Sequence, residues 1–227
     1  MIKTIFIQQK IQEYFSMSFR KEIKATLNQG KLSNLIKWIF QNNGRILYPE
    51  RLINSIYFDT KNLNMYFESV EGVLPRKKIR LRTYELENSL EKIKDKANLE
   101  YKISSVEGRF KVSKKKFNKN ENNLYQGLRD KDYGLCKPTL NVVYLRTYYK
   151  IKNIRLTIDR SIVYKKIRFL KILPFSIRDN LNVVELKYSN NSLDNQIINS
   201  FPFQFNRFSK YCRGIEFTQK KHCDELI

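Results

Sequence analysis

The sequence has few of the residues that most metal centres and nucleophilic enzymes use. It contains a single histidine, His222, and only three cysteines, which show no C-x-x-C spacing. A disulfide framework, a zinc site or a cysteine–histidine catalytic couple is therefore not expected, and a reducing compartment fits this cysteine usage. No G-x-x-x-x-G-K sequence occurs, so the common glycine-rich phosphate loop is excluded.

Long apolar runs and targeting signals are absent as well. No stretch approaches the roughly 20 apolar residues that a membrane-spanning helix needs. The first residues lack the pattern of a signal-peptide cleavage site. We therefore expect a cytoplasmic location and no membrane segment within the sequence.

Acidic residues are scarce relative to basic ones. The 227 residues include 44 Lys and Arg but only 22 Asp and Glu, which gives a formal net charge of +22. This excess predicts an anionic partner. Charge alone fits a nucleic-acid binder or a solubilising surface equally well, and part of it, such as Lys114-Lys115-Lys116, is typical of a solvated loop.

Charged and apolar residues alternate in four short segments. Three of them, residues 22–24, 100–102 and 185–187, place a glutamate and a lysine one residue apart. The fourth, residues 76–82, has a basic side chain at every second position. Because side chains two apart on a strand share a face, the pattern predicts a sheet curled around a charged, mostly cationic interior. Such an interior requires a polyanion.

A single α+β domain, built mostly from strands, is predicted for the chain. An N-terminal arm or short helix is expected over residues 1–18, the folded domain over 19–219 and a C-terminal tail over 220–227. Hydrophobic periodicity and turn residues predict the elements. The expected strands cover residues 19–27, 53–59, 76–85, 98–104, 140–150, 154–164 and 183–188, and the expected helices cover 32–43 and 193–200, with a loop and short helix over 112–132.

Nine motifs occur in a fixed order along the chain. They are R-x-E-x-K at 20–24, the segments 55–60, 78–84 and 99–102, Lys111, and the segments 142–146, 155–159, 183–188 and 208–211. In this order they resemble the VTC domain of polyphosphate polymerases, in particular the short bacterial form, a branch of the triphosphate tunnel metalloenzymes. The resemblance covers residues 19–217, nearly the whole chain.

The resemblance implies an eight-stranded antiparallel β-barrel tunnel with a charged lumen and helices packed outside. VTC domains transfer the γ-phosphate of ATP to a growing inorganic polyphosphate chain and use a divalent metal, Mn²⁺ or Mg²⁺. The implied metal ligand is Glu185. The implied catalytic and phosphate-binding residues are Lys24, Arg80, Arg82, Lys102, Lys111, Arg146, Arg155 and Lys210. Polymerases of this family often work beside membrane proteins, so such a partner is implied too.

The residues themselves support a polyanionic ligand. With Lys78 and Lys187, ten cations are assigned to the lumen, and two of them spaced by one residue repel by ~2.4 kcal/mol at ~7 Å and an effective dielectric of ~20. The only carboxylates set against these cations are those of Glu22, Glu100, Asp159 and Glu185. The first three are assigned to charge balance. A triphosphate or polyphosphate offers several charges in a narrow rod, which suits a tunnel.

Several alternatives stay open at this stage. Hydrolytic relatives begin with E-x-E-x-K, and Arg20 stands at the first of these positions, which disfavours a triphosphate hydrolase. A non-catalytic module for polyphosphate or inositol pyrophosphate is the third hypothesis. Nucleic-acid binding is disfavoured because the charges alternate within strands. Three tyrosines are candidates for stacking a nucleobase at the tunnel mouth, although packing is their commoner role: Tyr148, Tyr149 and Tyr211.

Overall fold

The computed structural model describes residues 21–105, 108–114, 127–188 and 192–220. The arm predicted for residues 1–18 and the tail beyond residue 220 lie outside this part of the chain. Among the described residues, no helix combines the length and the apolar character needed to cross a membrane.

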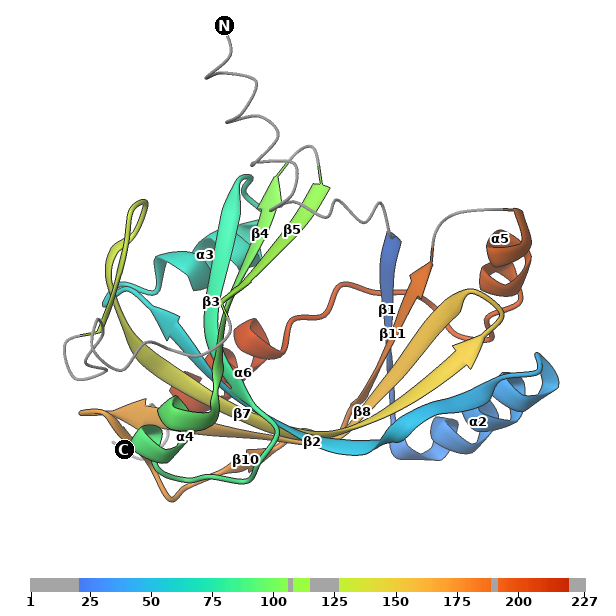
Figure 1. Ribbon diagram of the computed structural model, residues 1–227, viewed down its shortest axis with the longest axis horizontal. Coiled ribbons are helices and arrows are strands. Elements are labelled where there is room, and N and C mark those ends of the chain that lie inside the picture. The colour runs from blue at the N-terminus through green and yellow to red at the C-terminus, as the bar shows by residue number, and fades with distance from the viewer. Residues whose placement is uncertain (1–20, 106–107, 115–126, 189–191, 221–227) are drawn as a thin grey trace, which may run out of the picture.

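Eight antiparallel strands follow one another across a sheet that curls into a half-barrel (Figure 1). In spatial order they are β1 (Lys21–Leu27), β11 (Asn182–Tyr188), β8 (Ile154–Arg168), β7 (Gly134–Ile151), β2 (Arg45–Asp59), β3 (Arg76–Thr83), β4 (Asn98–Ser105) and β5 (Gly108–Lys114). Strands β2, β7 and β8 form the floor, β3 to β5 rise on one side, and β1 and β11 rise on the other. The predicted α+β class and antiparallel, barrel-like sheet are confirmed.

Three short strands extend the sheet, and the floor strands are longer than predicted. Strand β6 (Leu128–Asp130) pairs with β7, and β9 (Lys171–Ile172) and β10 (Ile177–Arg178) pair with β8. Strand β2 begins eight residues before the predicted start at Ile53. Its pairing with β7 shifts register on both sides of Tyr48. This irregularity accommodates Pro49 within the strand, at positions where the sequence pattern predicted no strand.

Two helices pack on the outer face of the sheet: α2 (Leu32–Gln41) and α5 (Ser192–Asn199). Helix α2 follows the 3₁₀ turn η1 (Gln29–Lys31). Both helices were predicted. Leu35, Trp38 and Ile39 of α2 contact the outward side chains of β8 and β11, such as Leu156 and Leu186. The charged segments therefore bury their apolar residues outside the half-barrel and turn their charges inward.

Three helices were not predicted: α3 (Asn64–Glu71), α4 (Leu90–Lys96) and α6 (Lys210–Lys220). The Asp59 carboxylate at the end of β2 accepts hydrogen bonds from the backbone N–H groups of Met65 and Tyr66, both at 3.0 Å, and so caps α3. It also accepts a hydrogen bond from the Tyr211 hydroxyl of α6. One buried carboxylate thus ties α3 and α6 to the floor.

Helix α6 covers half of the inner face. It packs on inward apolar side chains of β2, β7 and β8, including Tyr57, Leu140 and Tyr164. A Cβ atom on Gly214 would lie 2.5 Å from Leu140 Cδ2 and 2.7 Å from the Tyr164 ring, so the close approach depends on glycine. The sequence pattern suggested a charged inner face throughout, and the structure differs. One half of the inner face is apolar and covered by α6, and the other half carries the charges.

Candidate active site in a basic bore

The charged half of the inner face, here called the bore, collects side chains from six strands and the first residue of α6. Because the charged residues alternate along each strand, they face one another across neighbouring strands, for example Lys24 opposite Glu185 and Arg80 opposite Glu100. The bore residues joined to one another by ion pairs are Glu22, Lys24, Arg80, Arg82, Glu100, Lys102, Arg146, Asp159, Glu185, Lys187 and Lys210.

Two glutamates and three lysines form the first ionic cluster. The Glu22 carboxylate lies 3.4 Å from Lys24 Nζ, 3.5 Å from Lys187 Nζ and 3.3 Å from Lys102 Nζ. The Glu185 carboxylate lies 3.0 Å from Lys187 Nζ and 4.0 Å from Lys24 Nζ. Lys102 comes from β4 and Glu22 from β1, which stand on opposite sides of the half-barrel in Figure 1. This pair therefore bridges the bore.

The cluster shifts the pKa values of its members in opposite directions. Burial and the neighbouring Glu185 oppose ionisation of Glu22, but the three lysines prevail and lower its pKa to about 2. Burial also opposes ionisation of Glu185, yet Lys187 and Lys24 hold its pKa well below the usual value. Burial and then the charge of Lys24 lower the pKa of Lys102 to about 7, although Glu22 and Glu185 act against this shift. Both glutamates are ionised at neutral pH, and Lys102 is only partly protonated.

Arg146, Asp159 and Lys210 form a second cluster on the floor. Asp159 is fully buried and accepts hydrogen bonds from Arg146 Nε at 2.5 Å, Arg146 Nη2 at 2.7 Å and Lys210 Nζ at 2.5 Å. Burial opposes ionisation of Asp159, but the two cations lower its pKa. Asp159 thus fixes the Arg146 guanidinium and the start of α6.

Arg80, Arg82 and Glu100 form a third cluster on the wall of the bore. Arg80 donates from Nε to Glu100 Oε2 at 2.8 Å and from Nη1 to the Tyr57 hydroxyl at 3.0 Å, while Arg82 Nη1 lies 3.6 Å from Glu100 Oε2. Burial opposes ionisation of Tyr57, but Arg80 and Arg82 lower its pKa, which reports a positive local potential. Arg82 Nε is buried and meets no acceptor within the described part of the chain. A phosphate oxygen is an acceptor suited to it.

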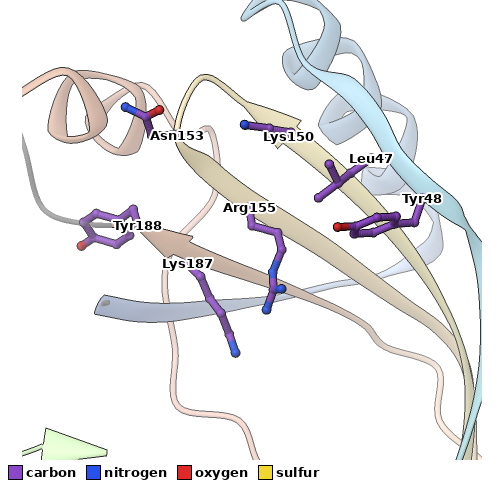
Figure 2. Close-up of a pocket in the computed structure, with 7 residues that line it drawn as sticks. All are labelled: Leu47, Tyr48, Lys150, Asn153, Arg155, Lys187 and Tyr188. Carbon is purple, nitrogen blue, oxygen red and sulfur yellow. The ribbon is translucent and has the colours of Figure 1, made fainter. Parts of the chain in front are cut away.

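Three predicted residues lie away from these clusters. The Lys78 ammonium donates to Ser209 Oγ at 2.9 Å, next to α6, and burial lowers its pKa. Arg155 is exposed and lines a pocket at one end of the half-barrel, together with Lys187 (Figure 2). Lys111 lies on β5 opposite Lys102 in the backbone register, and its side chain is outside the described structure.

Tyr148 is the one candidate stacking tyrosine that stays partly exposed on the inner face. Tyr149 is buried in the outer core beside α2, and Tyr211 is buried in the inner core, where its ring stacks on Tyr57 at 5.1 Å. Packing is therefore the role of those two residues.

Sequence reasoning missed Arg51 and Tyr48. Arg51 lies opposite Arg146 in the register of β2 and β7, and its guanidinium carbon lies 5.6 Å from the Tyr48 ring centre and 6.0 Å from that of Tyr148. Counting back by two from the inward residue Ile53 leads to Arg51. The signal was lost because the predicted strand started at Ile53.

This geometry defines a class of fold: a curled antiparallel sheet whose inner face carries a basic bore. The family described as the VTC domain matches residues 7–219, so the chain belongs to the VTC domain family. No curated protein matches the sequence.

Several solved structures are similar in fold at low identity. A candidate adenylate cyclase from Bacillus halodurans is 12% identical, with a TM-score of 0.49 over 84% of this chain and 95% of that one. A candidate adenylyl cyclase from Hippeastrum with dominant triphosphatase activity is 12% identical, with a TM-score of 0.46 over 86% and 94%. The Mimivirus capping enzyme triphosphatase is 13% identical, with a TM-score of 0.36 over 87% and 94%. No functional argument follows from similarities this low.

Proposed function

We propose that this protein is a polyphosphate polymerase that transfers the γ-phosphate of ATP to a growing inorganic polyphosphate chain. The observation that carries the proposal is the charge balance of the bore. Among the residues whose side chains the structure describes, seven ion-paired cations there face four carboxylates, each of which already contacts two or more of them. The carboxylates cannot neutralise the bore, so positive charge is left for a ligand with several negative charges along its length.

The arginines and lysines suit different tasks in this reaction. Arg80, Arg82 and Arg146 are held in place by carboxylates and present planar donor groups that can grip phosphate oxygens at fixed positions. Lys24, Lys102 and Lys187 supply mobile point charges. Phosphoryl transfer depends mainly on in-line placement and on neutralising charge at the moving group, and these residues provide both.

The residues present fit a divalent metal. Glu22 and Glu185 are both ionised and share Lys24 and Lys187 as partners. Mg²⁺ and similar cations commonly use one or two carboxylates and complete their shell with phosphate oxygens and water. The described residues contain no group of three or more His, Cys, Asp or Glu side chains that would hold a metal alone. Glu185, with Glu22 beside it, would hold the ion, which when bound neutralises phosphate charge.

The proposal is tested by incubating the purified protein with ATP and Mn²⁺. The expected products are ADP and acid-labile chains that stain as polyphosphate on a gel, with little orthophosphate. Lys102→Gln should reduce synthesis strongly, whereas Lys37→Gln, an exposed lysine on α2, should not. ADP with orthophosphate alone would identify a hydrolase, and binding of polyphosphate without turnover would identify a non-catalytic module.

A further inference from the structure

An aromatic and basic mouth lies at the end of the bore where Arg155 is exposed. The pocket there is lined by Leu47, Tyr48, Lys150, Asn153, Arg155, Lys187 and Tyr188. Figure 2 shows the Tyr48 ring pointing toward Arg155, and the side chains of Arg155 and Lys187 extending in the same direction. Tyr48 of β2 therefore lies on one side of the mouth, across from the cations Arg155 of β8 and Lys187 of β11.

The aromatic side of the mouth continues into a group of contacting side chains rather than ending at a single ring. Tyr48 and Tyr148 meet edge to face, with ring centres 5.7 Å apart and planes at 81°. The exposed Arg51 lies over both rings. Tyr48 is 47% exposed, whereas Tyr57 and Tyr144 on the same face of the sheet are buried. Accessible rings with a guanidinium above them are the usual platform for a nucleobase.

The spacing along β7 connects this platform to the phosphate-binding residues. Tyr144, Arg146, Tyr148 and Lys150 alternate on the inner face, with ~7 Å between successive side chains. A base stacked at Tyr148 would direct its phosphates toward Arg146 and the rest of the bore. Arg51, opposite Arg146 in the register, stands between the two regions.

We infer that Tyr48, Arg51 and Tyr148 bind the nucleobase of the nucleoside triphosphate substrate, with its phosphates in the bore. The inference rests on the proposed function for the identity of the substrate. Stacking depends on the π-face that every base has, so this mouth accepts purine nucleotides with little discrimination between them. The bore then needs no base-specific contact to position the reacting phosphates.

The test compares a nucleotide with a ligand that has no base. Binding of the non-hydrolysable ATP analogue AMP-PNP, its guanosine counterpart and inorganic tripolyphosphate is measured by calorimetry with Mg²⁺ present. The double variant Tyr48→Ala/Tyr148→Ala should weaken both nucleotides by about tenfold or more, because stacking contributes ~1–3 kcal/mol per base. Tripolyphosphate should bind within about twofold of its wild-type affinity.

Two controls keep the result interpretable. Tyr48→Phe/Tyr148→Phe retains the rings and should keep nucleotide affinity, and Phe67→Ala removes an exposed ring on α3, away from the bore, and should change nothing. Equal weakening of all three ligands, or no weakening of any, would overturn the inference. Because binding is read without turnover, a protein that makes no polyphosphate but loses only nucleotide affinity would refute the polymerase proposal and leave this site standing.

Discussion

Under the proposed function, Lys102 would link phosphate binding to pH. Its side chain is 38% exposed, and its pKa is lowered to about 7 by burial and by Lys24, with Glu22, Glu185 and Arg80 as the other charges that act on it. A phosphate group near the ammonium would restore the pKa toward its usual value of 10.5. Binding must then take up a proton wherever Lys102 is deprotonated in the free protein.

The size of this effect follows from the two pKa values. Between pH 7 and pH 10.5 the free protein lacks a proton that the complex holds, so affinity falls as pH rises. From pH 7.0 to pH 8.5 the contribution of Lys102 is about tenfold in the dissociation constant. The sign for stability follows the same reasoning: the unfolded chain binds more protons than the fold in this window, so Lys102 makes the free protein more stable as pH rises.

Calorimetry of tripolyphosphate binding measures both quantities. Titrations in buffers of different ionisation enthalpy give the number of protons taken up, and titrations at pH 7.0 and 8.5 give the change in affinity. The ligand titrates as well, so Lys102→Gln is the reference: the wild type should take up close to one proton more than this variant at pH 8.5. Identical proton uptake in the two proteins would refute the assignment of Lys102 to the phosphate site.

Three further predictions test other parts of the structure. Arg146→Ala leaves the fully buried Asp159 with Lys210 as its remaining cation, so we expect the free energy of unfolding, measured in urea, to fall by about 3 kcal/mol. The exposed Arg155→Ala should lower it by less than about 0.5 kcal/mol, and equal effects of the two substitutions would contradict the buried cluster. Gly214→Ala places a Cβ against Leu140 and Tyr164 and should destabilise the protein by about 1–2 kcal/mol in the same assay, whereas Gly30→Ala, with open space around it, should not. Glu185→Gln should raise the metal concentration needed for half-maximal synthesis at least tenfold without weakening metal-free tripolyphosphate binding, since it removes a negative charge; an unchanged metal titration would take Glu185 out of the metal site.

The strand periodicity predicted the face of several residues that lie in the bore. Lys24, Arg80 and Glu185 lie on the face that alternation predicted, because side chains two residues apart on a strand point to the same face of the sheet. The same rule, carried two residues back from Ile53, would have found Arg51. It failed there because a proline and a register shift hide a continuous strand in the sequence.

The position of α6 was beyond such reasoning. Its apolar residues, such as Tyr211 and Ile215, pack on the inner face, but periodicity tells only that a helix has an apolar side and not which face of a sheet receives it. For the same reason the sequence could not show that Lys78 turns toward Ser209. The contact of Lys102 with Glu22, 80 residues away, depends on the curl of the whole sheet.

The ion pairs explain how a folded protein tolerates so many cations before a ligand arrives. Each bore carboxylate bridges two or more basic side chains, so like charges that would repel are separated by a shared anion: Glu22 lies between Lys24, Lys102 and Lys187, and Asp159 between Arg146 and Lys210. A phosphate chain would affect the ion pairs of these two clusters differently. Asp159 is fully buried and holds its partners at 2.5 Å, so this cluster is fixed, whereas the longer, partly exposed contacts of Glu22 can exchange for phosphate oxygens. Under the proposed function, the fixed floor cluster would hold the reacting phosphate still, and the exchangeable contacts of Glu22 would let the chain behind it move on.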